Sequence, residues 1–90
     1  MIRSYKIVVS GKVHGVGFRY NAQARAHALG LTGFVRNEHN GTVLTHAEGQ
    51  EDKINLFIEW CNTGPRLAEV SEVEATEQSV QGYQTFEIKR

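Results

Sequence analysis

Residues Leu31 to Glu48 read LTGFVRNEHNGTVLTHAE, two strand-like runs on either side of the pair Asn40-Gly41. An Asn-Gly pair is the strongest short-range signal for a β-hairpin, because both residue types tolerate a positive φ. The flanking runs are rich in Thr, Val and Phe, which favour strands. The segment therefore predicts a hairpin with strands over residues 31–37 and 42–48, and Gly49 ends the second strand.

A helical pattern lies on each side of this hairpin. Before it, apolar residues recur at spacings of four, four and three from Phe18 to Leu29, and Gly30 is a typical helix end. After it, residues 51–62 form a second amphipathic pattern that stops at Gly64-Pro65. Its apolar face consists of Ile54, Phe57, Ile58 and Cys61. We expect Cys61 to be a buried, inert thiol and Trp60 to be a packing residue.

Further strands are predicted over residues 4–12, 70–76 and 83–89, with a turn over 79–82. The resulting order is β-α-β-β-α-β plus one extra C-terminal strand. This order predicts an α+β, ferredoxin-like sandwich, an antiparallel sheet with two helices on one face. The length of 90 residues fits one core, so we expect a single domain over residues 1–90. Because this architecture hosts many unrelated activities, function must be argued from particular residues.

Composition excludes some classes of protein. Ten basic and ten acidic side chains give a formal net charge of zero, which argues against a nucleic-acid partner. The charges are unevenly spread, since residues 1–36 hold six of the basic residues and no Asp or Glu. That asymmetry suits an anionic ligand, but it equally fits solvated surface charge.

The single cysteine, Cys61, excludes an intrachain disulfide and suits a reducing cytosol. The first apolar block, Ile7-Val8-Val9, is too short for a signal peptide or a membrane span. We therefore expect a soluble, cytoplasmic protein with no membrane partner.

The segment from Gly11 to Arg19 reads GKVHGVGFR and carries the first chemical signal. It predicts a strand, a glycine-bearing loop and the first turn of a helix with an arginine in that turn. The first N–H groups of a helix lack partners, glycines let a phosphate come close to them, and arginine adds two parallel donors. The segment predicts an oxyanion cradle, although glycines at a strand-to-helix junction also serve plain turns.

A second signal is Asn37, which ends the strand GFVRN before the hairpin. Its amide offers both a donor and an acceptor, so it could hold a water molecule in a fixed direction. An asparagine at a strand end is also a common turn former, and the residue alone leaves both readings open.

Taken together, GKVHGVGFR and GFVRN resemble the paired motifs of the acylphosphatase family. The resemblance continues through Asn40-Gly41-Thr42-Val43, Ala47-Glu48-Gly49, Gly64-Pro65 and Phe86-Glu87-Ile88, and so spans nearly the whole chain. It implies a hydrolase that cleaves small acyl phosphates to a carboxylate and inorganic phosphate. It also implies a site without metal or cofactor. Inorganic phosphate or sulfate presents the same oxygens and should compete for that site, and we expect a compact domain of 90 residues to be a monomer.

The resemblance also implies roles for particular residues. In the family, the backbone of the glycine loop and the arginine bind the phosphate, and the asparagine binds the nucleophilic water. Carried onto this sequence, phosphate binding falls on His14, Gly15, Val16, Gly17, Phe18 and Arg19, and catalysis falls on Arg19 and Asn37. One position departs from the family, since His14 stands where glutamine is common. We expect this position to act mainly through its backbone.

The chemistry of acyl phosphates fits these residues. The leaving group is a carboxylate, so its departure needs no strong general acid, and a phosphate oxygen can accept the proton of the water. Catalysis then requires charge neutralisation and alignment. The four histidines show no metal-ligand spacing.

Three other functions fit the sequence less well. An RNA-recognition module would need aromatics on its central strands, and the run 42–48 has none. A metal chaperone would need paired cysteines, and the chain has one. An acylphosphatase-like domain of a carbamoyl-transfer protein belongs to much larger chains, so the length of 90 residues argues against it.

Overall fold

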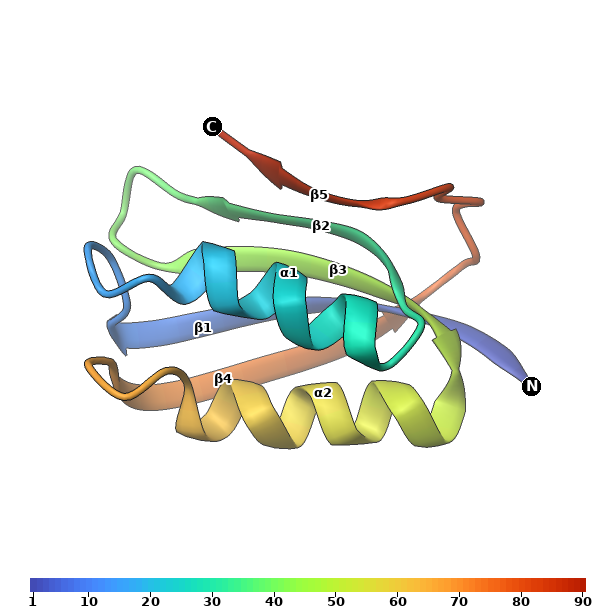
Figure 1. Ribbon diagram of the computed structural model, residues 1–90, viewed down its shortest axis with the longest axis horizontal. Coiled ribbons are helices and arrows are strands. Elements are labelled where there is room, and N and C mark those ends of the chain that lie inside the picture. The colour runs from blue at the N-terminus through green and yellow to red at the C-terminus, as the bar shows by residue number, and fades with distance from the viewer.

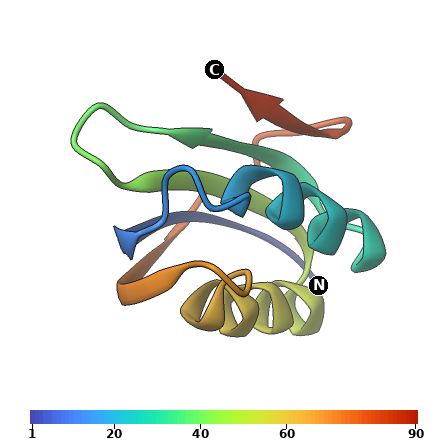
Figure 2. The ribbon, with the colours of Figure 1, turned by 60° about the vertical axis from the view of Figure 1, so that its left-hand side comes forward.

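The computed structural model describes residues 1–90 and contains five strands and two helices. In chain order they are β1 (Ile2–Lys12), α1 (Phe18–Ala28), β2 (Thr32–Asn37), β3 (Val43–Gln50), α2 (Glu51–Thr63), β4 (Glu69–Gln78) and β5 (Phe86–Lys89). This is the order predicted from the sequence. Both helices cover one face of the sheet and leave the other face without a helix (Figures 1 and 2).

The sheet has the strand order β4-β1-β3-β2-β5. Neighbouring strands are antiparallel from β4 to β2, and β5 joins β2 in parallel. The predicted ferredoxin-like sandwich is confirmed, and the extra strand makes its sheet mixed. The parallel pairing follows from the path of the chain, because β4 runs opposite to β2 and ends at the same end of the sheet at which β2 starts. The chain then crosses from one edge of the sheet to the other, reverses, and enters β5 in the direction of β2.

One hydrophobic core fills the space between the sheet and the helices. The predicted helix faces supply it, since Phe18, Ala22 and Ala26 of α1 and Ile54, Phe57 and Cys61 of α2 are buried. Alanines let α1 lie close to the sheet. Trp60 packs on the core, with its ring 5.2 Å from that of Phe18. The predicted burial of Cys61 is confirmed, and it raises the pKa of the thiol to about 12, which disfavours the reactive thiolate.

The β2–β3 connection differs in detail from the predicted Asn-Gly turn. It spans residues 38–42, and only Gly41 has a positive φ, of 92°. Asn40 instead accepts hydrogen bonds at its side-chain Oδ1 from the Thr42 N–H, at 3.1 Å, and from the Thr42 hydroxyl, at 2.7 Å. A side-chain oxygen that binds the backbone two residues on is a common way for asparagine to stabilise a loop.

The β4–β5 connection, residues 79–85, crosses the face of the sheet that has no helix and covers part of it. The ring of Phe34 lies 4.4 Å from that of His46, and Tyr83 packs edge-on against both. His46 Nδ1 lies 3.1 Å from the Gln78 amide nitrogen, so it is an acceptor, and the Tyr83 hydroxyl donates to it at 2.7 Å. Burial lowers the pKa of His46, and the nearby cations Lys6, Arg36 and Lys89 lower it further.

Glu48 anchors the β4–β5 connection. Its carboxylate accepts hydrogen bonds from the backbone N–H groups of Gln81, Gly82 and Tyr83, at 2.7, 2.9 and 3.2 Å. These N–H groups bind the carboxylate in place of a neighbouring strand, so β5 begins at Phe86 and not at residue 83 as predicted. Burial alone would raise the pKa of Glu48, but these bonds and one from the Ser4 hydroxyl outweigh it, and the net shift is downward.

A carboxylate with a lowered pKa in the folded state stabilises the fold above its unfolded pKa, and this stabilisation is lost as the pH falls through the folded value. We expect Glu48→Gln to lower the free energy of unfolding at pH 7 by about 1–3 kcal/mol. The deficit should shrink as the pH is lowered toward 3, because protonation progressively removes the wild-type charge. Urea unfolding at both pH values measures this, with exposed Glu74→Gln as the control. A deficit that stays constant with pH would contradict the anchoring role of the charge.

Candidate active site

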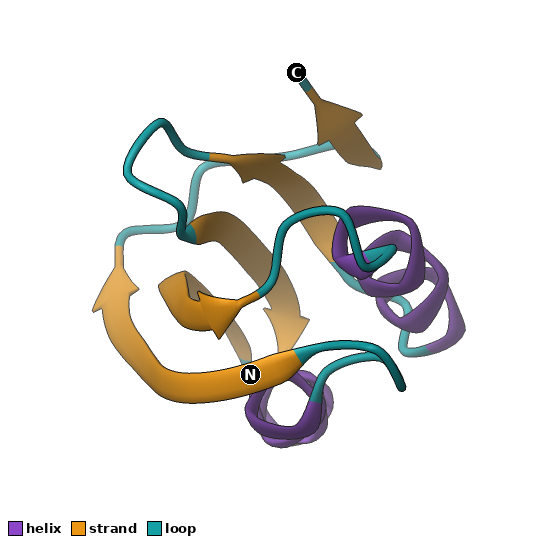
Figure 3. Cartoon of the chain, turned by 90° about the vertical axis from the view of Figure 1, so that its left-hand side faces the viewer, coloured by secondary structure: helices purple, strands orange, loops and turns teal.

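Three connections meet at one end of the sheet, away from the N-terminus: β1–α1, β2–β3 and α2–β4 (Figure 1). Figure 3 looks onto this end. A cavity of about 210 Å³ opens here between the β1–α1 connection, α1, the end of β2 and β5. Its lining residues are Val13, Gly15, Gly17, Phe18, Arg19, Tyr20, Asn37, Ile88 and Arg90. It is smaller than the ~300–1,000 Å³ of pockets for drug-sized ligands, which suits a small molecule.

Residues 14–17, the glycine loop, present unpaired backbone donors at this cavity. Gly15 and Gly17 have φ values of 70° and 77°, in the left-handed region that side chains disfavour. The backbone N–H groups from His14 to Tyr20 donate to no backbone acceptor. The N-cap of α1 is Gly17, which has no side chain to cap the helix, and the first turn holds no acid. Such N–H groups, with the positive end of the helix dipole, favour a negative ligand.

Asn21 fixes the junction between this loop and α1. Its side-chain amide donates to the Gly17 carbonyl oxygen at 2.7 Å, and its backbone N–H donates to the same oxygen at 3.1 Å. The Gly17 carbonyl is thereby held by the first turn of α1, and the N–H groups before it stay without a backbone acceptor.

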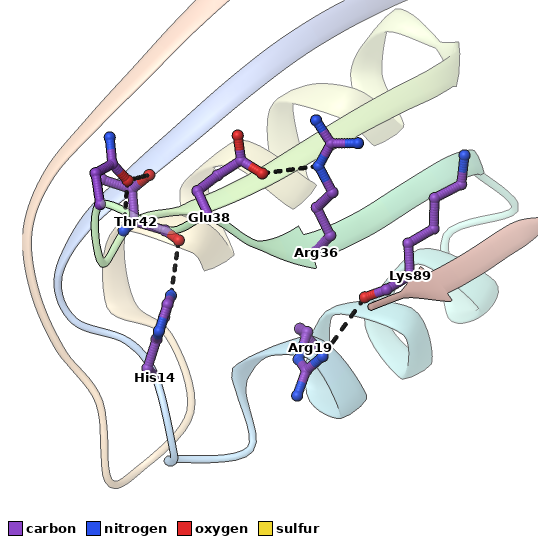
Figure 4. A network of polar contacts seen from close by, with 7 residues as sticks. His14, Arg19, Arg36, Glu38, Thr42 and Lys89 are labelled. Carbon is purple, nitrogen blue, oxygen red and sulfur yellow. Dashed lines mark hydrogen bonds and ion pairs between the residues drawn. The ribbon is translucent and has the colours of Figure 1, made fainter.

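Arg19 is half-buried at the cavity wall and takes part in none of the three ion pairs of the protein. Its one hydrogen bond runs from Nη1 to the Lys89 carbonyl oxygen, at the long distance of 3.5 Å (Figure 4). The remaining guanidinium donors lack protein partners. Arg90 also lines the cavity and no Asp or Glu does, so the charged side chains of the cavity wall are all positive.

Asn37 is the last residue of β2 and lies on the same face of the sheet as the buried Val35. Its side-chain Oδ1 is buried and has no hydrogen-bond partner. A buried polar atom without a partner is unfavourable by ~1–3 kcal/mol, so such an atom at a cavity indicates a water or ligand position.

The structure brings together at this cavity five of the seven residues that the sequence singled out: Gly15, Gly17, Phe18, Arg19 and Asn37. The other two point elsewhere. The Val16 side chain is buried in the core, and the His14 imidazole reaches the Thr42 carbonyl oxygen, with 2.8 Å between Nε2 and that oxygen. For these two, only the backbone N–H groups remain as possible contacts to a ligand in the cavity.

Sequence reasoning missed four residues of the cavity wall. Val13 and Tyr20 flank the predicted loop and helix start, while Ile88 and Arg90 come from the far end of the chain. Ile88 pairs with Val35, which lies two residues before Asn37 on the same face of β2, so Ile88 lies close to Asn37. Only the parallel register of β5 could have indicated this neighbourhood.

No three His, Cys, Asp or Glu side chains lie close enough together to hold a metal ion. Neither helix has the length and apolarity needed to cross a membrane.

The fold and the site define a small α+β domain in which a glycine loop and an arginine meet at a helix N-terminus. The acylphosphatase family model matches residues 5–88. The chain belongs to the acylphosphatase family, hydrolases that act on acyl phosphates.

Individual members of the family are closely similar to it. An acylphosphatase of Acaryochloris marina is 48% identical over 94% of this chain and 91% of its own length. The structure of an acylphosphatase from Coxiella burnetii has a TM-score of 0.95 at 39% identity, covering 98% of this chain and 93% of that one. The crystal structure of acylphosphatase from Bacillus subtilis also has a TM-score of 0.95, at 37% identity over the whole of both chains. The resemblance found in the sequence is confirmed.

Proposed function

We propose that this chain hydrolyses the carboxyl–phosphate bond of small acyl phosphates by metal-free attack of a water that Asn37 positions, with Arg19 and the glycine loop binding the phosphate. One observation carries these roles. A single cavity contains free backbone N–H groups, an arginine without an acidic partner and a buried amide oxygen without a partner.

Phosphate binding uses the fixed donors of the loop and helix start. The N–H groups of His14, Gly15, Val16, Gly17 and Phe18 converge on the phosphate oxygens, and Arg19 adds two parallel N–H donors. Because these donors are already oriented before the substrate arrives, they stabilise the charge that accumulates on the phosphoryl oxygens without rearranging. Neutral N–H groups and a guanidinium bind an anion and repel a metal cation, which supports a mechanism without metal.

The water is held by Asn37. One O–H of the water donates to the unpartnered Oδ1, and the other donates to a phosphate oxygen of the substrate, which receives the proton as the water attacks. The oxygen of the water then attacks phosphorus opposite the leaving carboxylate. The carboxylate departs as a stable anion and needs no general acid.

The same geometry supports the narrower predictions about partners. Inorganic phosphate or sulfate presents the same oxygens and should compete with the substrate. Phe34 is 7% exposed and lies beneath the Lys89 ammonium, 4.6 Å from its ring, so it offers no open face to a nucleic-acid base. A single domain over residues 1–90, a monomeric state, a cytoplasmic location and the absence of a membrane partner stay predictions.

The proposed reaction predicts release of inorganic phosphate from a synthetic acyl phosphate such as acetyl phosphate. Excess chelator should leave the rate unchanged. The measurement compares phosphate release by purified protein with and without chelator, against the spontaneous rate. Loss of activity with chelator and recovery with an added divalent ion would contradict the metal-free mechanism.

The two central residues should respond differently to substitution. Arg19→Ala and Arg19→Lys should both weaken inhibition by inorganic phosphate and lower turnover, since lysine keeps the charge but lacks the planar fork. Asn37→Ala should lower kcat by about 10²–10³ and change the inhibition constant of phosphate little. Circular dichroism must show an intact fold, because Asn37 precedes the hairpin. Near-normal kcat in a folded Asn37→Ala protein would make this residue a turn former only.

The backbone donors can be tested with a matched pair of glycines. Gly15 and Gly30 have φ values of 70° and 71°, and an added Cβ at either would meet no atom within 4 Å. Alanine should therefore strain both backbones alike, by ~1–2 kcal/mol. Inorganic phosphate should raise the Tm of wild type and Gly30→Ala, since it binds only the folded state, and raise that of Gly15→Ala much less. Equal shifts in both variants would place the anion elsewhere.

A further inference from the structure

The Thr42 carbonyl oxygen joins the two segments of the proposed site. It accepts a hydrogen bond from the Glu38 N–H at 2.9 Å, and it accepts a second from His14 Nε2 at 2.8 Å. Glu38 is bonded covalently to Asn37, and His14 begins the glycine loop. Figure 4 shows the His14 side chain directed away from the loop toward this carbonyl.

The bond fixes which ring nitrogen of His14 carries a proton. A carbonyl oxygen can only accept, so Nε2 must carry a proton, whether the ring is neutral or charged. The neutral ring then leaves Nδ1 without a proton. The partner is itself held in place, because the Thr42 N–H and hydroxyl both donate to Asn40 Oδ1. The imidazole therefore binds a rigid part of the β2–β3 connection.

No other hydrogen bond joins residues 14–17 to residues 37–42. The sheet register pairs β1 with β3 only as far as Val9 and Val43, so the chain beyond those residues reaches the cavity without ladder bonds between the two segments. Without the imidazole, no hydrogen bond would join the glycine loop directly to the β2–β3 connection.

We propose that the His14 side chain is a positioning residue, which holds the glycine loop at a fixed spacing from Asn37 through the Thr42 carbonyl. The inference rests on the proposed function, in which the loop binds phosphate and Asn37 holds the water. It assigns the imidazole a role beyond the backbone contribution expected from the sequence. In-line attack requires the water and the phosphorus to be aligned, and a small shift of the loop removes that alignment without removing either group.

The test compares kcat for acetyl phosphate in four proteins: wild type, His14→Ala, His14→Gln and His39→Ala. His14→Ala should lower kcat by about 3- to 10-fold, the net effect of one hydrogen bond. His14→Gln should restore most of this loss, because its amide N–H can donate to the same oxygen. His39 is exposed on the same connection and has no hydrogen bond, so His39→Ala should match wild type.

A second comparison separates positioning from a general loosening of the fold. Adding His14→Ala to Asn37→Ala should lower kcat by less than about 2-fold, since no held water remains to be aligned with the loop. Additive losses would overturn the inference. So would wild-type kcat in His14→Ala, a failure of folded His14→Gln to restore activity, or unfolding of His14→Ala by circular dichroism. Absence of turnover in wild type would instead overturn the proposed function.

Discussion

The close pairing of β2 with β3 at Gly33 is the contact on which the other elements depend. A Cβ at this position would overlap the His46 carbonyl, so only glycine lets the two backbones approach here. On its other side, the Gly33 N–H donates to the Thr85 carbonyl oxygen at 2.8 Å, which starts the attachment of β5. Since β2 is thus fixed on both sides, its last residue, Asn37, has a defined position at the end of the sheet.

The helix layer sets the other half of the site. Ala22 and Ala26 are fully buried, and their small side chains let α1 lie close to the strands. The start of α1 therefore comes close to the end of β2, and Phe18 anchors it against Trp60 of α2. Packing that stabilises the core also brings the unpaired N–H groups of one segment next to the unpartnered amide of another.

The sequence was sufficient for the element order and for the helix faces, because periodicity in α1 and α2 reports which residues are buried. It was also sufficient for the family, because GKVHGVGFR and GFVRN are local motifs. It could not predict that β5 pairs in parallel with β2, since this depends on where the end of β4 lies. It could not predict that Glu48 would bind Gln81, Gly82 and Tyr83, because that contact joins segments 33 to 35 residues apart.

For the candidate site, the same distinction holds. Gly15, Gly17, Arg19 and Asn37 could be named from local motifs, and the structure gathers them at one cavity. Ile88 and Arg90 could not, because only the sheet register brings the C-terminal strand there. The contact of His14 with Thr42 lay outside any local pattern as well, since it depends on how the β2–β3 connection folds back.

Because the site consists largely of main-chain N–H groups, the positions of the loop should differ in the substitutions that evolution accepts. The side chains of His14 and Val16 point away from the cavity, so substitutions at these positions keep the backbone N–H donors of the loop. Gly15 and Gly17 are different, because their backbone angles, and not their side chains, create the shape of the loop. Selection should therefore reject side chains at the two glycines, and accept at His14 and Val16 those replacements that keep the hydrogen bond to Thr42 and the apolar packing.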